Sequence, residues 1–377
     1  MISEDCENFS VKPYISLSKV RDIIQQFYGL KATDLEELNS YDDRNFRFSV
    51  YEDGDPNAEC HRKRLYLLKI SGYLPEKCES ILSLHNGIMI HLWKQGISCQ
   101  RPLTSVNNRL VELVELPQFP STDLTVGGRK RTHTLRLFTF VQGQMWSSLT
   151  PLETESYWHM GAFLARLHRH LKQHLRSWTE PISEKAWSLI NAPNALDYVE
   201  FVMDENHRQL ARNVLQTFRD KYSEKLRITN WIPGMVDKEF PITLIHGDPN
   251  DLNILINRTS SDDGSLDFGI LDWEDCAVSR RVYDLALMLM YMMCCETTVS
   301  TAKLTEFGQA IIQGFQCEAS KDDWCLTHAE RTCLVILVAV RFAQSLILGE
   351  HTFRVKDPGN EYVMLTAKQG GWEKLSS

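Results

Sequence analysis

The pattern of apolar residues in the first third of the chain predicts a small sheet accompanied by two helices. Residues 16–30 carry apolar side chains at helical spacing and include Gly29 near their end, a residue that commonly stops helices. Apolar and polar residues then alternate in the way that is typical of strands with one buried face. We expect strands at 45–51, 64–70, 110–116 and 135–141, a turn at 53–57 and a second helix at 76–95.

Beyond Gly143 the pattern becomes mainly helical. Apolar residues at helical spacing predict long helices, and short apolar runs between polar turns predict a few strands. The expected helices are 153–174, 197–226, 282–295, 302–315, 324–348 and 362–375, and the expected strands are 242–245, 253–256 and 269–271. We therefore predict an α+β chain with a small, antiparallel β-rich N-terminal lobe over 1–142 and a larger, mainly helical C-terminal lobe over 143–377.

The composition is that of an ordinary globular chain and narrows the range of partners. Of the 377 residues, 43% are hydrophobic and 24% are charged, which excludes a disordered or low-complexity chain. The formal net charge is −8, and this balance argues against nucleic acids and anionic membranes as partners. The short basic run at 129–131 is expected on a solvated loop.

Further patterns favour a cytoplasmic protein. The first residues include Glu4, Asp5 and Glu7, whereas a secretory signal begins with positive charge. The apolar runs 285–295 and 333–340 are shorter than the roughly 20 residues that span a bilayer, so both are expected as buried helices. The ten cysteines form no C-x-x-C pair, and without a secretion signal we expect them as reduced thiols.

Two polar segments, 246–253 and 269–274, carry the residue types that phosphoryl transfer needs. Asp248 and Asn253 are separated by four residues, as in the D-x-x-x-x-N catalytic loop of protein kinases. A carboxylate near the attacking hydroxyl accepts its proton, while an amide oxygen and a second carboxylate, here Asp272, hold Mg2+ on the nucleotide phosphates. The alternative is a pair of polar turns between strands. Both segments together, in this order and between apolar strands, favour a kinase.

The same segments resemble the aminoglycoside phosphotransferase and choline kinase superfamily. The resemblance rests on His-Gly-Asp at 246–248 followed by Asn253, on Leu-Asp-Trp-Glu at 271–274 and on Tyr-Asp-Leu-Ala at 283–286. It covers nearly the whole chain, because further segments resemble hydroxylysine kinases: 40–46, 250–256, 290–293, 341–346 and 362–368.

This resemblance implies a protein-kinase-like bilobal fold and a kinase that acts on a small alcohol. It implies GTP as the phosphate donor, with ATP also possible, 5-hydroxy-L-lysine as the acceptor in lysine degradation, and Mg2+ as the metal. Carried over to this sequence, Asp248 becomes the catalytic base, and Asn253 and Asp272 become the metal ligands. Lys69 matches the strand lysine that contacts the α- and β-phosphates. No protein partner is implied.

The N-terminal lobe departs from the kinase pattern at its phosphate-binding turn. No G-x-G-x-x-G motif is present, and Ser40, Asp42, Asp43 and Asn45 occupy the turn instead. We expect backbone N–H groups and the side chains of Ser40 or Asn45 to contact the phosphates. The backbone of the expected hinge, 138–142, would contact the base of the nucleotide.

The helix partner of Lys69 stays open on sequence alone. Ser83 stands where the family has a glutamate, and Glu79 lies one turn earlier on the same helix face. Glu79 either substitutes as the partner of Lys69 or faces solvent.

Several charged residues near these motifs are candidates for binding the substrate. Asp251, Glu274 and Asp275 could hold its ammonium groups, or could order the loop or face solvent. Arg341 could hold its carboxylate, or could form an ordinary salt bridge at the end of a buried helix. Asp284, at the start of an apolar helix, is expected as a cap or loop anchor.

Other features favour structural roles. His168, His170 and His174 share a helix, and without a third ligand they indicate a solvated basic face rather than a zinc site. The methionine-rich run 288–293 is expected in a buried helix, and Trp273 is expected to pack beneath the metal-binding loop.

Three functions remain open at this point. The leading hypothesis is a hydroxylysine kinase. The nearest rival is another small-alcohol kinase, acting on choline, ethanolamine, homoserine or a thiosugar, because the substrate pocket of this fold has no portable motif. The third is a catalytically inactive nucleotide-binding scaffold. The missing glycine loop and Ser83 favour the scaffold, whereas retention of Lys69, Asp248, Asn253 and Asp272 opposes it.

Overall fold

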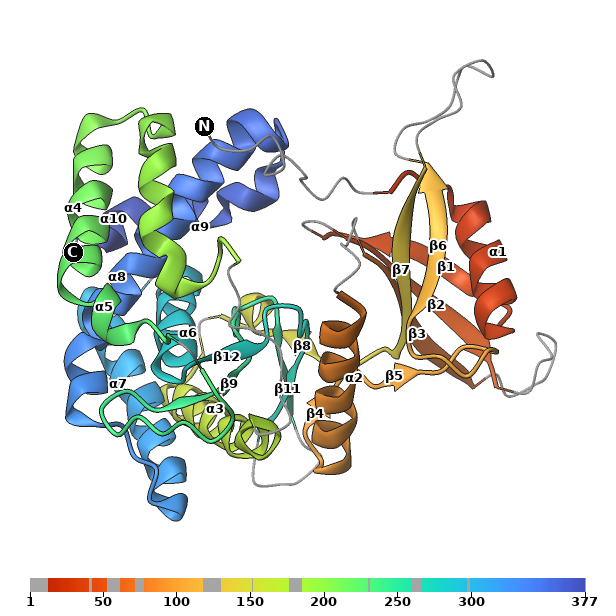
Figure 1. Ribbon diagram of the computed structural model, residues 1–377, viewed down its shortest axis with the longest axis horizontal. Helices are drawn as coiled ribbons and strands as arrows, with labels where there is room; N and C mark the ends of the chain where they lie inside the picture. Colours follow the sequence, from red (N-terminus) through yellow and green to blue (C-terminus); the bar gives the residue numbers. More distant parts are fainter. Residues whose placement is uncertain are drawn as a thin grey trace. The chain divides into compact units, whose positions relative to one another are not determined.

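The chain forms two compact units, Met1–Gln142 and Gly143–Ser377, which run from red to yellow and from yellow to blue in Figure 1. The first contains an antiparallel sheet and the second is mainly helical, which confirms the predicted α+β class. The computed structural model describes residues 13–40, 43–52, 62–71, 78–117, 130–150, 152–175, 185–229, 231–258, 266–296 and 299–376.

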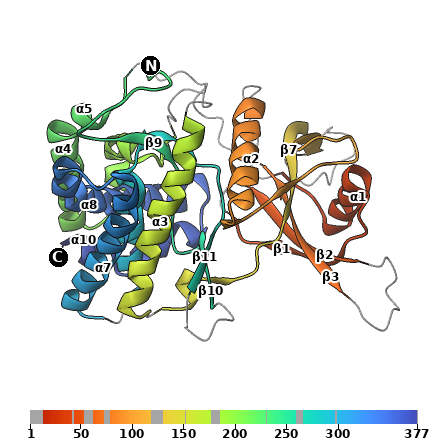
Figure 2. The same cartoon turned by 90° about the horizontal axis from the view of Figure 1, so that it is seen from below.

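An antiparallel sheet organises the first unit. Its strands follow the order β1–β2–β3–β7, and both β5 and β6 pair with β7. In the two views of Figures 1 and 2 the helices α1 and α2 lie on opposite faces of this sheet. The elements are α1 (Leu17–Tyr28), β1 (Thr33–Leu38), β2 (Arg44–Tyr51), β3 (Lys63–Ile70), α2 (Cys78–Lys94), β4 (Ser98–Cys99), β5 (Pro102–Leu103), β6 (Glu112–Pro117) and β7 (Lys130–Thr139).

Local signals in the sequence set the bounds of α1. The Ser16 side chain accepts a hydrogen bond from the backbone N–H of Lys19 (3.3 Å), and Gly29 ends the helix with a φ of 66°. The apolar face of α1 packs on one face of the sheet and forms a core with it. This core includes Val20, Ile23, Ile24, Phe46, Phe48, Leu68, Ile70, Leu135 and Leu137.

The second unit surrounds short antiparallel ribbons with helices. Strand β10 pairs with both β8 and β11, and β9 pairs with β12. The strands and short 3-10 helices are β8 (Gln144–Met145), η2 (Trp146–Ser148), η4 (Leu189–Phe201), β9 (Ile242–Ile245), β10 (Ile254–Arg258), β11 (Leu266–Ile270), β12 (Ala277–Arg280), η5 (Ser320–Asp322) and η7 (Glu361–Met364). The α-helices are α3 (Thr154–His174), α4 (Glu205–Lys221), α5 (Ser223–Leu226), α6 (Val282–Cys295), α7 (Thr301–Ala319), α8 (His328–His351), α9 (Leu365–Lys368) and α10 (Gly371–Ser376), with a π-helical turn, η6 (Thr352–Lys356), after α8.

Two glycines allow α3 and α7 to pack backbone against backbone. A Cβ atom at Gly161 would lie 1.9 Å from the carbonyl oxygen of Ile311, and one at Gly314 would lie 1.8 Å from that of Trp158. No larger residue fits at either position without separating the helices. This pair supports the ribbons, because α3 also contacts β9 and β11.

The long helix α8 is apolar because it lies in the core. The helical stretch His328–Lys356 is long and apolar enough to cross a membrane by length and composition alone. However, 72% of its most apolar window is buried inside the protein, and that is the pattern of a core helix. The predicted buried helix at 285–295 is confirmed, whereas 333–340 is helical as predicted but buries only one face and exposes Val335.

The structure differs from the predicted elements where the local pattern is weak. Strands β1 and β12 were not predicted, because β1 is mostly exposed and polar, while all four residues of β12 are buried and show no alternation. The basic run was predicted on a solvated loop; Lys130 and Arg131 instead begin β7, and Arg129 lies outside the described residues. The predicted turn at 53–57 also lies outside them.

Candidate functional site

The loop between β9 and β10 is shaped by its own side chains. Asn250 Oδ1 accepts hydrogen bonds from the backbone N–H groups of Leu252 (2.9 Å) and Asn253 (2.8 Å), which forms an Asx-type turn. The amide nitrogen of Asn250 donates to Oδ2 of Asp248 at 2.7 Å. Asn250 is therefore a site residue without a predicted role. The signal that points to it is its place in a polar turn, where Asn commonly forms such bonds.

Asp284, near the start of α6, anchors the first half of this loop. Its carboxylate accepts hydrogen bonds from the backbone N–H groups of His246 (2.8 Å) and Gly247 (2.9 Å). On α3, His168 Nε2 lies 2.8 Å from the same carboxylate, and both side chains are fully buried. The predicted loop anchor is confirmed for Asp284. The predicted solvated face is wrong for His168, because this side chain pairs with a buried carboxylate.

His246 links the loop to the segment that follows β11. Its Nε2 lies 2.9 Å from the carbonyl oxygen of Leu271, and its Nδ1 accepts from the backbone N–H of Asp248 at 3.3 Å. Burial lowers the pKa of His246, and a neutral ring with its proton on Nε2 satisfies both bonds. Trp273 packs edge-on against this ring with centroids 4.8 Å apart, which confirms its predicted place beneath the loop.

The predicted metal ligands Asn253 and Asp272 lie at the same end of the β10–β11 ribbon. Ile254, the first residue of β10, pairs with Ile270, the last residue of β11. Just beyond this pair, the backbone N–H of Leu271 donates to the carbonyl oxygen of Asn253 at 2.8 Å. The strand register thus brings together two side chains that are far apart in the sequence.

The side-chain oxygen atoms at this end of the ribbon are suitable ligands for a magnesium ion. Asn253 Nδ2 donates to the backbone oxygen of Asp248 (3.0 Å) and to its Oδ2 (3.3 Å), which leaves the amide oxygen Oδ1 as the acceptor. Asp272 has a φ of 59°, a backbone conformation that costs a non-glycine residue about 1–2 kcal/mol. Mg2+ prefers such hard oxygen ligands and completes its coordination with water and phosphate. Among the described residues no group of three or more His, Cys, Asp or Glu is placed to hold a metal.

Asp248 lies in an enclosed environment with several negative charges. Its side chain is 21% exposed, and its Oδ1 faces the guanidinium of Arg341 at 3.4 Å. Burial raises the pKa of Asp248 to about 7; Arg341 lowers this pKa, and the carboxylates of Asp275 and Asp272 raise it. A carboxyl group with a pKa near neutrality is suited to accept a proton from an alcohol.

The three carboxylates predicted as ammonium ligands have different surroundings. Asp251 is buried near the thiol of Cys295, and burial raises the pKa of its carboxyl group. Asp275 is half-buried and pairs with Lys185 Nζ at 2.9 Å; burial opposes its ionisation, but Lys185 holds the pKa of Asp275 below its usual value. Lys185 also donates to the backbone carbonyl of Glu274. Lys185 had no predicted role.

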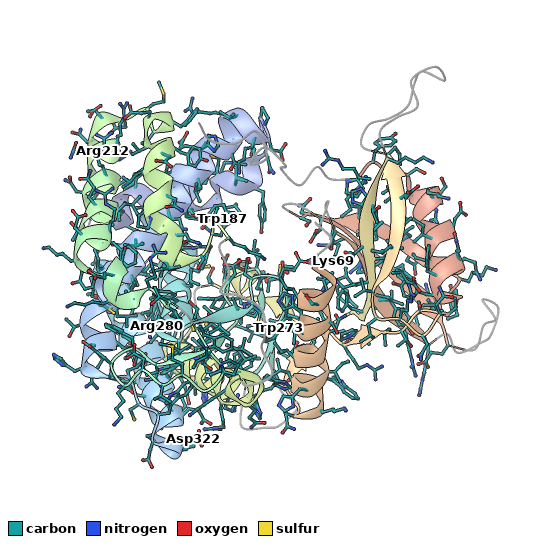
Figure 3. All side chains as sticks on the ribbon, viewed as in Figure 1. Lys69, Trp187, Arg212, Trp273, Arg280 and Asp322 are labelled. Carbon is teal, nitrogen blue, oxygen red and sulfur yellow. The ribbon has the colours of Figure 1, made fainter. Side chains whose placement is uncertain are left out.

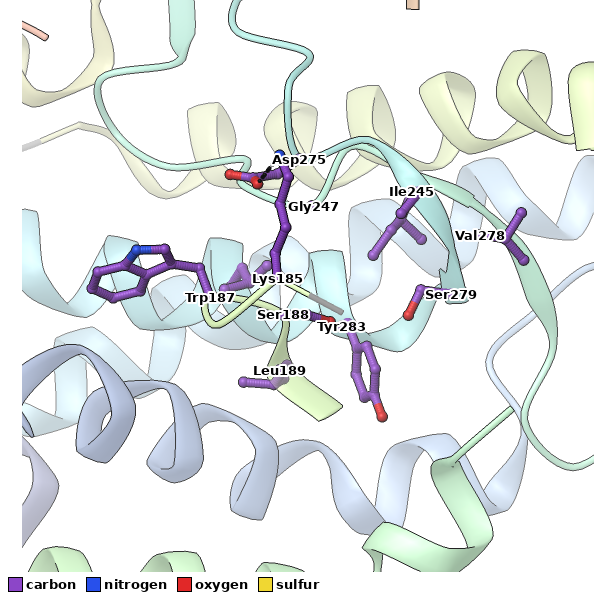
Figure 4. A pocket seen from close by; sticks show the side chains of 12 residues that line it. Lys185, Trp187, Ser188, Leu189, Ile245, Gly247, Asp275, Val278, Ser279 and Tyr283 are labelled. Carbon is purple, nitrogen blue, oxygen red and sulfur yellow. Dashed lines mark hydrogen bonds and ion pairs between the residues drawn. The ribbon is translucent and has the colours of Figure 1, made fainter. Parts of the chain in front are cut away.

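A small cavity beside the loop is lined by Lys185 and Asp275 (Figure 4). Its volume is about 20 Å³, which is room for about one water molecule and too little for an amino acid. Gly247 lines the cavity with a φ of 89°, and a Cβ atom there would lie 2.2 Å from the carbonyl oxygen of Asp275. Only glycine fits this position, and the cavity does not mark a substrate pocket.

Three aromatic side chains lie near the acidic groups. Trp187 and Tyr291 have their rings 5.3 and 5.7 Å from the guanidinium carbon of Arg341. Tyr362 belongs to η7 and is 39% exposed; partial burial, and then the charges of nearby carboxylates, Asp248 among them, raise its pKa. None of the three was predicted as a site residue, although Tyr362 begins the segment 362–368 that resembles hydroxylysine kinases.

In the first unit, a polar row crosses the sheet at Lys69. Asn45, Lys69 and Arg136 are directly opposite one another on β2, β3 and β7. Because their neighbours Leu68 and Leu137 belong to the core with α1, the row lies on the other face of the sheet. Arg136 is buried and was not predicted; among the described residues Asn45 Oδ1 is buried without a hydrogen-bond partner.

Lys69 pairs with a residue of the turn rather than with a described residue of α2. Its Nζ lies 2.9 Å from Oδ2 of Asp43, and both side chains are more than nine-tenths buried. Ser83 on α2 is exposed, and the side chain of Glu79 lies outside the described residues, as does Asp42. Ser40 is half-buried at the end of the described segment before this turn.

The predicted hinge at 138–142 begins inside β7. The backbone N–H of Thr139 donates to the carbonyl oxygen of Arg101 (3.0 Å), and that of Phe140 donates to the carbonyl oxygen of Leu65 (3.1 Å). These two N–H groups are committed to the first unit and are not available to a nucleotide base.

The family model and the similar proteins both indicate a phosphotransferase. The model of the phosphotransferase enzyme family matches residues 73–323, which is more than half of the chain. Hydroxylysine kinases from Xenopus laevis and Bos taurus are each 26% identical over 379 and 374 residues. The two alignments cover 97% of this chain and 90% and 89% of the relatives.

Solved structures have the same fold. The amicoumacin kinase hAmiN, in complex with AMP-PNP, Ca2+ and Ami, superposes with a TM-score of 0.64 at 16% identity, covering 96% of this chain and 94% of its own. A microcompartment-associated aminopropanol kinase superposes with a TM-score of 0.62 at 15% identity, covering 94% and 95%. The predicted protein-kinase-like fold is confirmed.

Proposed function

Because this chain belongs to the phosphotransferase enzyme family, we propose that it transfers the γ-phosphate of GTP to the hydroxyl group of 5-hydroxy-L-lysine. One observation carries the proposal: Asp248 and Asn253 share one loop, and the β10–β11 register places Asp272 beside it. Similarity to hydroxylysine kinases along 97% of the chain supports the acceptor. The choice of GTP as phosphate donor follows from the family resemblance, and ATP is the alternative donor. A role in lysine degradation follows from the same substrate.

Asp248 is the catalytic base in this proposal. Its Oδ2 is held by Asn250 and Asn253, so that the carboxylate has a fixed orientation toward the acceptor. Asp248 takes the hydroxyl proton as the oxygen attacks the γ-phosphorus, and the bond to the β-phosphate oxygen breaks. Asn253 and Asp272 would hold Mg2+, which neutralises charge on the phosphates when it is bound.

Lys69 would contact the α- and β-phosphates. It is kept in place by Asp43, which can release the ammonium group to a phosphate of higher charge. Ser40 and Asn45 complete this set, and the buried, unpaired Oδ1 of Asn45 supports a ligand contact at that side chain.

The charges around Asp248 support a cationic acceptor. The charges of Asp251, Asp272 and Asp275 raise the pKa of Asp248, whereas the charge of Arg341 lowers it. A bound metal would offset part of this charge, and an ammonium group of the acceptor would offset more. Glu274 and Asp275 are half-buried and remain candidates to hold that ammonium group, while Asp251 is more enclosed.

A panel of acceptors tests the proposal. Purified protein is incubated with Mg2+ and GTP or ATP, together with 5-hydroxylysine, choline, ethanolamine, homoserine or a thiosugar, and phosphorylated products are identified by mass. Phosphorylation of 5-hydroxylysine supports the proposal. If only another acceptor is phosphorylated, that acceptor is the substrate and the assignment of 5-hydroxylysine is wrong. Nucleotide binding without product from any acceptor would indicate the inactive scaffold.

A further inference from the structure

The guanidinium of Arg341 lies against the catalytic base, although the two residues are far apart in sequence and sit on different elements. Arg341 Nη2 is 3.4 Å from Asp248 Oδ1, while the other carboxylate oxygen of Asp248 accepts the 2.7 Å bond from Asn250. Each oxygen of the base therefore faces its own donor. Two donors on opposite oxygens restrict the rotation of a carboxylate more than either donor alone.

Neutral partners fix Arg341 independently of Asp248. Its Nη1 donates to the carbonyl oxygen of Trp187 (2.9 Å) and to Oε1 of Gln344 (3.1 Å), and its Nη2 donates to the hydroxyl of Tyr291 (2.9 Å). These bonds are shorter than the 3.4 Å contact with Asp248. The guanidinium is thus placed by its neutral surroundings and not by Asp248 alone.

The partners of Arg341 are themselves held in place. Gln344 lies one turn further along α8, and its amide nitrogen donates to the carbonyl oxygens of Ala186 (2.8 Å) and Ser188 (3.2 Å). Trp187, between these two residues, has its ring 5.3 Å from the guanidinium carbon. The segment before η4 is therefore fastened to α8 at the position of Arg341.

Arg341 is also too enclosed to bind a substrate group directly. The residue is 3% exposed, and its Nε–H group is buried without a hydrogen-bond partner among the described residues. A substrate carboxylate would have to displace Tyr291 or Asp248 to make a bidentate contact with it. This burial argues against the role of carboxylate ligand that the sequence left open.

We propose that Arg341 is a positioning residue that holds Asp248 in the orientation needed to accept the proton of the acceptor hydroxyl. The inference rests on the proposed function, since it takes Asp248 as the base. It predicts that Arg341 acts on turnover and not on recognition of the substrate's carboxylate.

A comparison of two acceptors separates these roles. The first is 5-hydroxylysine, and the second is 1,5-diaminopentan-2-ol, the same amino alcohol without the carboxylate. Arg341→Met should lower kcat by about 100-fold for both acceptors, as expected for a misplaced catalytic group, with little change in KM. Arg341→Lys should recover part of the loss, because it keeps a positive charge near Asp248.

Arg280 on β12 provides a matched control. It is also 3% exposed and also buried among carbonyl oxygens, but it pairs with Asp237 and lies opposite Ile242, at the other end of β9 from the loop (Figure 3). Arg280→Met should cost stability and leave kcat per folded molecule unchanged. If Arg341→Met does not fold, Tyr291→Phe removes one of the bonds that place the guanidinium and should lower kcat for both acceptors alike.

Two results would overturn the inference. A loss confined to 5-hydroxylysine and expressed in KM would make Arg341 a carboxylate ligand, and an unchanged kcat in folded Arg341 and Tyr291 variants would make it a packing residue. If wild-type protein phosphorylates neither acceptor, the proposed substrate is wrong. The inference is then tested on the slow hydrolysis of nucleotide by water, which Arg341→Met should reduce and Arg280→Met should not.

Discussion

His168 Nε2 and Asp284 Oδ2 lie 2.8 Å apart in the interior of the second unit, where both side chains are fully buried. The same carboxylate receives the backbone N–H groups of His246 and Gly247. The side chain of Asp284 thus joins α3, α6 and the loop that carries Asp248. The position of Asp248, the proposed base, depends on this junction.

Replacing Asp284 should strongly destabilise the protein. Asp284→Ala leaves two backbone N–H groups and His168 without their acceptor, and breaking a buried pair of this type costs about 3–5 kcal/mol. Urea denaturation measures the change in the free energy of unfolding. Asp322, which pairs with Arg169 on the surface of the same unit (Figure 3), is the control, and Asp322→Ala should change stability by less than about 1 kcal/mol. Equal losses in both variants would contradict the role of Asp284 as an anchor.

Removing the base should reduce turnover and spare nucleotide binding. Asp248→Asn should lower kcat by about two to four orders of magnitude, because an amide cannot accept the proton. The nucleotide dissociation constant should stay close to the wild-type value, since the carboxylate serves the acceptor. Steady-state kinetics and calorimetric titration with GTP measure the two effects. Wild-type turnover in a folded Asp248→Asn protein would remove Asp248 from the mechanism.

The pH dependence should report the raised pKa of Asp248. Burial raises this pKa to about 7, and the base acts in its ionised form. Protonation therefore inactivates the enzyme as pH falls through that value, and kcat/KM should drop about tenfold for each further pH unit. Above about pH 8 this carboxylate should no longer limit the rate. A profile that stays flat from about pH 8 down to about pH 5.5 would show that no group with this pKa is the base.

The two metal ligands should differ in their response to added magnesium. Asp272 contributes charge as well as an oxygen ligand, whereas Asn253 contributes an oxygen alone. Raising the Mg2+ concentration should therefore partly restore the activity of Asn253→Ala and hardly that of Asp272→Ala. Equal rescue of the two variants would show that the ligand roles are assigned wrongly.

In the first unit, Lys69 should govern the affinity for nucleotide. Lys69→Met removes a charged donor to phosphate and should weaken binding of GTP by about 10- to 100-fold. Lys63 begins the same strand but is exposed and pairs with Asp34, so Lys63→Met is the matched control and should bind nucleotide normally. Fluorescence or calorimetric titration compares the two. Similar affinities in both variants would exclude a phosphate contact at Lys69.

Regular elements could be predicted from the sequence wherever one residue pattern dominates. The bounds of α6 and β9 agree with the predicted ranges 282–295 and 242–245, because both are apolar runs, interrupted only by Asp284 and Thr243, between polar turns. Strand β1 could not be predicted in this way. It has one buried residue, Leu35, so its pairing with β2 rather than its own pattern makes it a strand.

The site could be predicted only as far as its residues are local in sequence. Asp248, Asn253 and Asp272 belong to short motifs, and the structure places all three around one loop and one ribbon end. The contact between Asp248 and Arg341 joins positions on separate elements, and no local pattern encodes it. The burial of His168 was missed for a related reason, because its carboxylate partner comes from another helix.

The ratio of kcat/KM values among acceptors shows whether 5-hydroxylysine is the substrate. Initial rates are measured with GTP and Mg2+ over a range of concentrations of 5-hydroxylysine, choline, ethanolamine and homoserine, with lysine added as a non-reacting analogue. We expect the highest kcat/KM by a wide margin for 5-hydroxylysine, because its remote charges orient the hydroxyl against Asp248. Lysine should inhibit without being phosphorylated. A preference for choline, or a rate with 5-hydroxylysine no greater than with ethanolamine, would contradict the claim.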